Sequence, residues 1–273
     1  MGIFANWRRK RILKHSRIPQ TEWDAIVAGL PLLAGLSQEE LRRLRDLATL
    51  FLHEKSFEPV QGLELNEAMK IDLAAQAALP ILNLGFHWYD GWTSVVLYPD
   101  EYATRHEWVD ENGLVHSRRE IRAGEAWERG PVVWSWADVA ASGACEDGYN
   151  TVIHELAHKL DSSSGHINGC PALHAGMRVR DWRAAFEPAF DDLCRRVDAG
   201  EHTAIDPYAT EAPEEFFAVT SEYFFELPGL LKQIYPAVYE QMRLFYRQDP
   251  VTRLAGQGVA IPSRSPDCHQ NIF

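Results

Sequence analysis

The sequence predicts an α+β fold, with helices at both ends of the chain and a small mixed sheet between them. Apolar residues recur at helical spacing through most of residues 21–79. Short β-rich runs replace this spacing between residues 93 and 136, and the chain becomes helical again from Asn150 almost to residue 247. Helices, then strands, then helices, without regular alternation, are typical of α+β proteins.

The first region, residues 1–80, is expected to be helical and to pack on the rest of the chain. Ser37, followed three residues later by Glu40, is typical of a helix start, because each side chain can bond a backbone N–H group of the first turn. Apolar residues then follow at helical spacing: Leu41, Leu44, Leu47, Ala48 and Phe51. A second helix is expected over residues 64–79, ending near Pro80.

The second region, residues 81–253, begins with the predicted strands. Residues 93–98 are rich in β-formers. Residues 106–109 and 114–117 flank Asn112-Gly113, a pair typical of a tight hairpin turn. Residues 131–136, PVVWSW, are expected to form an edge strand. The tail, residues 254–273, is rich in Gly, Pro and Ser and is expected to be irregular.

Composition excludes several classes of protein. The net charge of −12 over 273 residues argues against broad nucleic-acid binding, which needs clustered Lys and Arg, but leaves room for a basic protein partner. No apolar run is long enough for a membrane span, and no secretory signal is evident. The four cysteines show no CxxC spacing, so we expect reduced thiols and a cytoplasmic location.

Residues 152–160, VIHELAHKL, contain the pattern HExxH. Histidines four residues apart project from one face of a helix, so His154 and His158 can bind the same metal ion. Glu155 lies beside them and could accept a proton from a metal-bound water. Asn150 is a plausible N-cap, and the absence of Gly and Pro inside the motif favours the helix that the site requires. The sequence therefore predicts a catalytic zinc site, with one Zn²⁺ per chain.

The third protein ligand has to come from elsewhere, because the spacing of a third histidine found in metzincins fails at Asp161 and Ser164. Asp161 shares a helical face with both histidines and is one candidate. We favour for it an outer role, as a carboxylate that orients a ligand or ends the helix by hydrogen bonding.

A glutamate from a later helix is the candidate that we prefer. Residues 213–226, PEEFFAVTSEYFFE, predict a helix that begins at Pro213 and is apolar nearly all round, and hence buried. Glu215 and Glu222 lie seven residues apart, on one face of that helix. Buried carboxylates need a partner or a metal. We therefore expect Glu215 to bind the metal, and Glu222 to contact a metal ligand without binding the metal itself.

These motifs resemble a known family. HELAHKLD at 154–161, GPVVWSW at 130–136 and DPYATEAPEEFFAVTSEYFF at 206–225 are similar to the Mlc titration factor A family of zinc-dependent peptidases, from the N-terminal helices to about residue 250. The resemblance implies that residues 81–253 form a zincin-like catalytic domain similar to the anthrax lethal factor protease domain. It also implies that Tyr208, seven residues before Glu215, helps to stabilise the reacting oxyanion.

The resemblance further implies a cytoplasmic peptidase with aminopeptidase-type activity that interacts with Mlc, a glucose-responsive transcriptional repressor. The expected partners are thus a peptide substrate and a repressor of the Mlc type. An alternative is a regulatory protein that sequesters the repressor and has little peptidase activity. A purely structural zinc fits less well, because such sites normally have four protein ligands rich in Cys, and no Cys lies near the motif at a ligand spacing.

Overall fold

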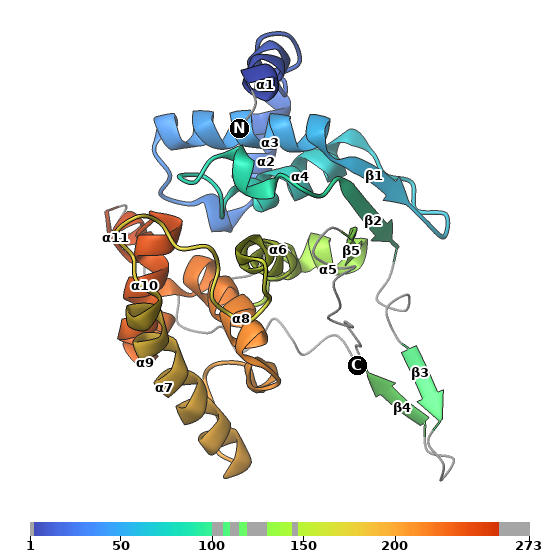
Figure 1. Ribbon diagram of the computed structural model, residues 1–273. Coiled ribbons are helices and arrows are strands. Elements are labelled where there is room, and N and C mark those ends of the chain that lie inside the picture. Colours follow the sequence, from blue (N-terminus) through green and yellow to red (C-terminus); the bar gives the residue numbers. More distant parts are fainter. Residues whose placement is uncertain (1–2, 100–105, 110–114, 119–129, 144–146, 257–273) are drawn as a thin grey trace.

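The computed structural model describes residues 3–99, 106–109, 115–118, 130–143 and 147–256 of the chain. Its N-terminal part is helical, as the sequence predicts. The elements are α1 (Ile3–His15), α2 (Gln20–Gly29), the 3-10 helix η1 (Pro31–Leu33), α3 (Gln38–Glu54) and α4 (Glu67–Ala78). Helix α3 packs on α1 and α4, and together they form the upper layer in Figure 1.

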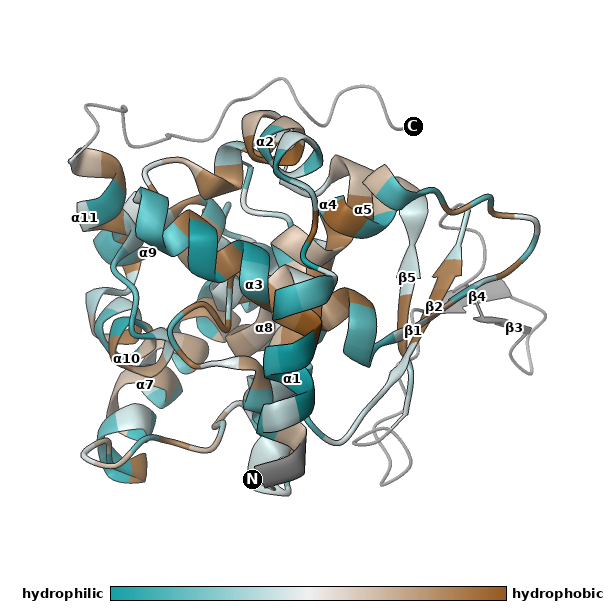
Figure 2. Ribbon diagram, turned by 90° about the horizontal axis from the view of Figure 1, so that it is seen from above, coloured by the Kyte–Doolittle hydropathy of each residue, from teal (hydrophilic) through white to brown (hydrophobic). Residues whose placement is uncertain are grey.

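The start of α3 confirms the expected pairing of Ser37 and Glu40. The Ser37 hydroxyl accepts a hydrogen bond from the Glu40 backbone N–H at 3.3 Å, and the Glu40 carboxylate accepts one from the Ser37 N–H at 2.8 Å. Helix α4 begins at Glu67, three residues later than expected, because Asn66 caps it by accepting from the Met69 N–H. Seen from above, the outward faces of α1 and α3 are largely hydrophilic (Figure 2).

The sheet corrects one expectation, since its three described strands are parallel and not mixed. Strands β1 (Ser56–Pro59), β2 (Ser94–Tyr98) and β5 (Val132–Ser135) lie in the order β1-β2-β5. Parallel neighbours need a long crossover. Helix α4 and the 3-10 helix η2 (Phe86–Tyr89) supply it between β1 and β2. Strand β5 lies at an edge of this sheet, as expected, and ends where α5 (Trp136–Ala141) begins.

The expected hairpin is a separate two-stranded element. Strands β3 (His106–Val109) and β4 (Val115–Arg118) pair antiparallel, with His106 opposite Arg118 and Val109 opposite Val115. The Asn112-Gly113 turn between them lies outside the described residues. In the described part of the chain, β3 and β4 pair with no strand of the main sheet. The antiparallel hairpin is therefore not part of that sheet, which stays parallel.

The C-terminal part is helical again. Its elements are α6 (Thr151–Asp161), η4 (Ser162–Ser164), α7 (Val179–Asp198), η5 (Pro207–Thr210), α8 (Pro213–Glu226), α9 (Pro228–Ile234), α10 (Pro236–Tyr246) and α11 (Pro250–Ala255). Residues 254 and 255 are thus helical and not part of an irregular tail, and residues 257–273 lie outside the described residues. The division into three regions stays a prediction.

Helix α6 lies at the centre of the molecule. It contacts α4 of the upper layer, α8 of the lower layer and strand β5 (Figure 1). Its apolar side chains Val152, Ile153, Leu156 and Leu160 are fully buried, and α8 is buried from Phe216 to Glu226, as its apolar composition predicts. Polar groups on these two helices therefore face each other inside the protein. None of the described helices is long and apolar enough to cross a membrane.

Candidate metal centre

His154 and His158 lie on successive turns of α6, as the HExxH spacing predicts. Asn150 caps this helix, since its side-chain oxygen accepts a hydrogen bond from the Ile153 N–H at 2.9 Å. The Nε2 atoms of the two histidines are 3.3 Å apart, and their rings meet edge to face. The side chains are 12% and 14% exposed, so the pair is mostly buried yet reachable from solvent.

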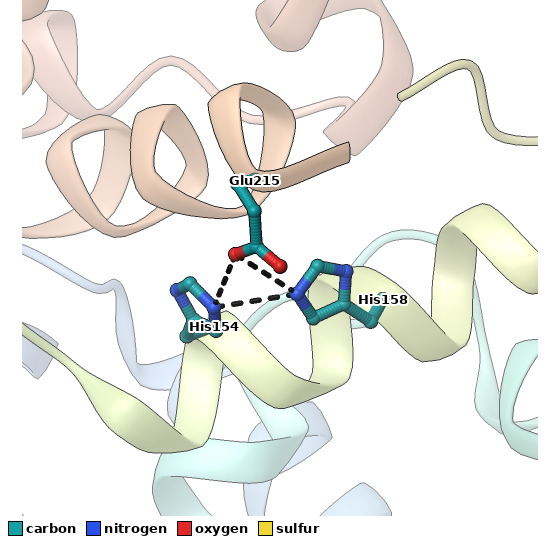
Figure 3. A group of neighbouring side chains, drawn as sticks. All are labelled: His154, His158 and Glu215. Atoms are coloured by element: carbon teal, nitrogen blue, oxygen red, sulfur yellow. Dashed lines mark hydrogen bonds and ion pairs between the residues drawn. The ribbon is translucent and has the colours of Figure 1, made fainter. Parts of the chain in front are cut away.

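Glu215, in the first turn of α8, points toward this pair (Figure 3). Its Oε2 atom lies 3.1 Å from His154 Nε2 and 3.5 Å from His158 Nε2. Among the described residues, His154, His158 and Glu215 are the group of side chains whose ligand atoms come close enough to share a metal ion. The structure therefore brings together the three ligands that the sequence analysis preferred.

The geometry of the three donor atoms fits a tetrahedral metal ion. Ligand atoms at about 2.0–2.1 Å from tetrahedral zinc lie roughly 3.3 Å from one another. The observed separations are 3.1, 3.3 and 3.5 Å. The Glu215 Oε2 atom is buried, yet it accepts no hydrogen bond of normal geometry from the described residues. Two imidazole nitrogens and a carboxylate oxygen are ligands that zinc prefers, so these residues fit the metal that the sequence predicts.

Glu222 contacts His154 on the side of the ring opposite to Glu215. Glu215 and Glu222 both belong to α8 and lie on the same face of that helix. The Oε1 atom of Glu222 is 2.8 Å from His154 Nδ1, and the Oε2 atom of Glu222 accepts a hydrogen bond from the Asn150 N–H at 2.5 Å. The side chain is 4% exposed. A carboxylate at Nδ1 holds the proton on that nitrogen and leaves Nε2 to face Glu215 and His158, which is the arrangement a metal-binding histidine needs.

The Asn150 side chain extends this buried contact to a third helix, α4, and to a second buried glutamate of α8. Its Nδ2 atom donates to Glu226 Oε1 at 2.9 Å and to Gln76 Oε1 at 3.2 Å. Sequence reasoning recognised Asn150 only as a helix cap and missed Gln76 and Glu226. The rule that buried carboxylates need partners would have found Glu226, which lies four residues after Glu222 on the same buried helix.

The protonation of the cluster follows from these contacts. Burial alone lowers the pKa of His154, but the nearby carboxylates of Glu215, Glu222 and Glu155 outweigh it and raise the pKa to about 10. Burial acts to raise the pKa of Glu215, yet the neighbouring histidines hold it well below its usual range. Burial raises the pKa of Glu222. Without a metal, the cluster therefore retains a proton that a metal ion has to displace.

Asp161 ends α6 and is fully buried, but it does not join the group around the metal site. Its Oδ2 atom accepts hydrogen bonds from the backbone N–H groups of Asn168 at 2.8 Å and Gly169 at 2.7 Å. Burial raises the pKa of Asp161 to about 6. These hydrogen bonds join Asp161 to the segment that follows α6, and an outer role that supports the metal site stays a prediction.

Glu155 and Tyr208 lie close to the histidines. Glu155 is partly buried on α6, between His154 and His158 in the chain, and its charge acts on His154. Tyr208 belongs to η5, which Asp206 caps by accepting from the Tyr208 N–H at 2.8 Å. The ring of Tyr208 is half-buried and its centroid lies 6.0 Å from that of His154. The structure thus places both residues beside the site, and their roles stay proposals.

A buried histidine pair and a glutamate from a second helix define a protein with a candidate site for a divalent metal ion. The chain belongs to the family of the glucose-regulated metallo-peptidases M90, whose model matches residues 4–247. It is 43% identical over 228 residues to Mlc titration factor A of Yersinia pestis (strain Pestoides F) and to that of Yersinia pseudotuberculosis serotype O:1b (strain IP 31758). The aligned region covers 82% of this chain and 84% of each relative. The family expected from the sequence is confirmed.

Proposed function

We propose that the protein is a zinc-dependent peptidase, with one zinc ion per chain held by His154, His158 and Glu215. The observation that carries the proposal is the convergence of their three ligand atoms at the separations that tetrahedral zinc requires. Three protein ligands leave a coordination position for reacting groups, whereas structural zinc normally has four. When bound, the zinc ion would supply a Lewis acid that polarises the peptide carbonyl and acidifies water.

The residues of the chain then divide the remaining work. Glu155 accepts the proton of the attacking water and delivers it to the amine nitrogen as the peptide bond breaks. Tyr208 donates a hydrogen bond from its hydroxyl group to the oxygen on which negative charge develops. Glu222 holds the Nδ1 proton of His154 and so fixes the orientation of that ring.

The edge strand β5 is our candidate for substrate binding. It lies beside α6 and at the end of the described sheet, so an extended peptide can add to it through backbone hydrogen bonds. An aminopeptidase-like activity and a cytoplasmic location are part of this proposal and rest on the resemblance to the family.

Glu155→Gln tests the proposed base. The variant should retain zinc, because the three ligands are unchanged, and lose about 10²–10⁴-fold in turnover, the usual contribution of a general base. The control is His158→Ala, which should lose zinc and activity together. Full turnover of Glu155→Gln would remove Glu155 from the mechanism.

A second function follows from the name of the relatives, which links them to Mlc. We propose that this protein also binds a sugar-responsive repressor of that type, and its net charge of −12 suits a partner with an exposed basic surface. The alternative is a protein that sequesters the repressor with little hydrolysis. Titrating the repressor of the source organism into the parent protein and into Glu155→Gln, at low and high salt, separates these cases.

Equal binding by both proteins, weakening as salt rises, would support a repressor site distinct from the catalytic residues. If the parent protein binds the repressor but hydrolyses no peptide under any condition, the sequestering alternative holds. No binding at low salt, with hydrolysis intact, would remove the repressor from the proposal.

A further inference from the structure

We propose that Asp161 and Gly169 are positioning residues for Glu215. Together they hold the segment that follows α6 against the first turn of α8, and so set the place of the third ligand relative to the two histidines. This inference rests on the proposed zinc site. Neither residue is expected to touch the metal or the substrate.

The third ligand poses a problem that the histidines do not. His154 and His158 share one helix, so their separation is set by the helix itself. Glu215 belongs to another helix, and α8 begins at Pro213 after Ala212, which provides no side-chain cap. Without a cap of its own, the beginning of α8 has to be placed by the neighbours that it contacts.

Asp161 connects α6 to one such neighbour, the segment at Gly169. It is the last residue of α6, lies three residues after His158, and is fully buried. Both of its described hydrogen bonds go to consecutive backbone N–H groups, those of Asn168 and Gly169. Hydrogen bonds to an ionised carboxylate are about twice as strong as those between neutral groups. The segment at Gly169 is thus tied directly to the helix that carries the histidines.

Gly169 in turn contacts the beginning of α8. Its φ angle is +74°, and a Cβ atom at this position would overlap the Pro213 carbonyl oxygen and lie 2.9 Å from its carbonyl carbon and 3.4 Å from the Glu214 nitrogen. Only glycine permits this approach of two backbones. The contact falls on the two residues that precede Glu215.

A second contact from Gly169 reaches α8 on the other side of Glu215. The Gly169 carbonyl oxygen accepts a hydrogen bond from Trp182 Nε1 at 2.8 Å. The indole ring of Trp182 packs edge-on against Phe217, with their centroids 5.7 Å apart. Pro213 and Phe217 lie two residues before and two residues after Glu215, so the segment at Gly169 fixes α8 on both sides of the ligand.

The chain offers a matched pair of variants to test this. Gly169→Ala and Gly165→Ala both force alanine into a positive φ, +74° and +86°, within the same connection between α6 and α7. The Cβ of Gly165→Ala meets no described atom within 4 Å, whereas that of Gly169→Ala meets Pro213. The two variants share the backbone strain and differ in the contact with α8.

The measurements are the zinc dissociation constant, from competition with a chelator, and the visible absorption of the Co²⁺-loaded protein, which reports ligand geometry. Gly169→Ala should weaken zinc binding about 10–100-fold, the range for residues that orient metal ligands, and should change the cobalt spectrum. Gly165→Ala should leave both unchanged. Thermal unfolding of the metal-free variants shows whether each remains folded.

Asp161→Asn is the second variant, and it decides the matter if Gly169→Ala does not fold. It keeps the size and one acceptor oxygen but removes the charge, so it should weaken zinc binding and shift the cobalt spectrum in the same direction. If the folded variants bind zinc as tightly as Gly165→Ala and give its cobalt spectrum, the positioning inference is wrong. If the parent protein binds neither zinc nor cobalt, the proposed metal site is wrong, and the inference falls with it.

Discussion

Replacing Glu222 by glutamine should weaken zinc binding without removing any proposed ligand. In the structure the Glu222 carboxylate accepts two hydrogen bonds, from His154 Nδ1 at 2.8 Å and from the Asn150 N–H at 2.5 Å. The side chain is 4% exposed, so water cannot take its place. Glutamine has one acceptor oxygen and one NH₂ group, so it can satisfy one of these two donors but not both.

The expected size of the effect follows from these two bonds. A hydrogen bond to a charged group contributes about 1.5–3 kcal/mol, and one between neutral groups about 0.5–1.5 kcal/mol. Exchanging a charged for a neutral acceptor at His154 thus costs about 1–1.5 kcal/mol, which is about tenfold in the dissociation constant. If glutamine turns its NH₂ group toward the ring, the loss should approach 100-fold, the upper range for such orienting residues.

The assay is chelator competition for zinc, with Glu226→Gln as the matched control. Glu226 is also a buried carboxylate on α8 and accepts a hydrogen bond from Asn150 Nδ2 at 2.9 Å, but its described contacts do not include His154. Glu226→Gln should therefore bind zinc nearly as tightly as the parent protein. Equal losses in the two variants would mean that buried charge in general, and not the bond to His154, supports the metal.

Two further predictions concern turnover and pH. Tyr208→Phe should retain zinc and lower turnover about 10²–10³-fold, the usual cost of losing one oxyanion donor. Turnover should fall more than substrate affinity, because the donor acts in the transition state. Unchanged steady-state rates would leave Tyr208 with a structural role only. Burial lowers the pKa of His154, but Glu215, Glu222 and Glu155 outweigh it and raise it to about 10 in the metal-free protein, so zinc competes with a proton across the neutral range. Because that proton is bound below the raised pKa, the apparent zinc affinity should rise about tenfold per unit between about pH 6 and about pH 9, and an affinity independent of pH would contradict the proposed protonation.

Much of the site could be predicted because helical periodicity relates residues over short distances in the chain. The spacing of four residues places His154 and His158 on one face of their helix. The spacing of seven residues places Glu215 and Glu222 on one face of a later helix. The apolar composition of residues 216–225 predicts that these glutamates are buried. Burial of charge then requires a partner, which the structure supplies as His154 and His158 for Glu215 and as His154 for Glu222.

The contacts between distant segments could not be predicted in this way. Asn150 meets Gln76 of α4, and Gly169 meets Pro213, and no local pattern marks either contact. Strand β1 has four residues, one of them Pro59, and lacks a buried alternation that would reveal it. The expected mixed sheet is wrong because the antiparallel pair β3–β4 stays apart from the parallel strands β1, β2 and β5, and no local pattern shows which strands will pair.

If His154, His158 and Glu215 form a catalytic zinc site, the protein purified without added metal should already contain zinc, which elemental analysis measures. We expect about one zinc per chain in the parent protein and in Glu155→Gln, and little or none in Glu215→Gln. The same assay tests whether Asp161 is a ligand. Because we expect that it is not, the Asp161→Asn variant should still contain zinc as purified. A folded protein that hydrolyses peptides without any bound metal would contradict the catalytic zinc site, and a Glu215→Gln variant with full zinc content would contradict Glu215 as its third ligand.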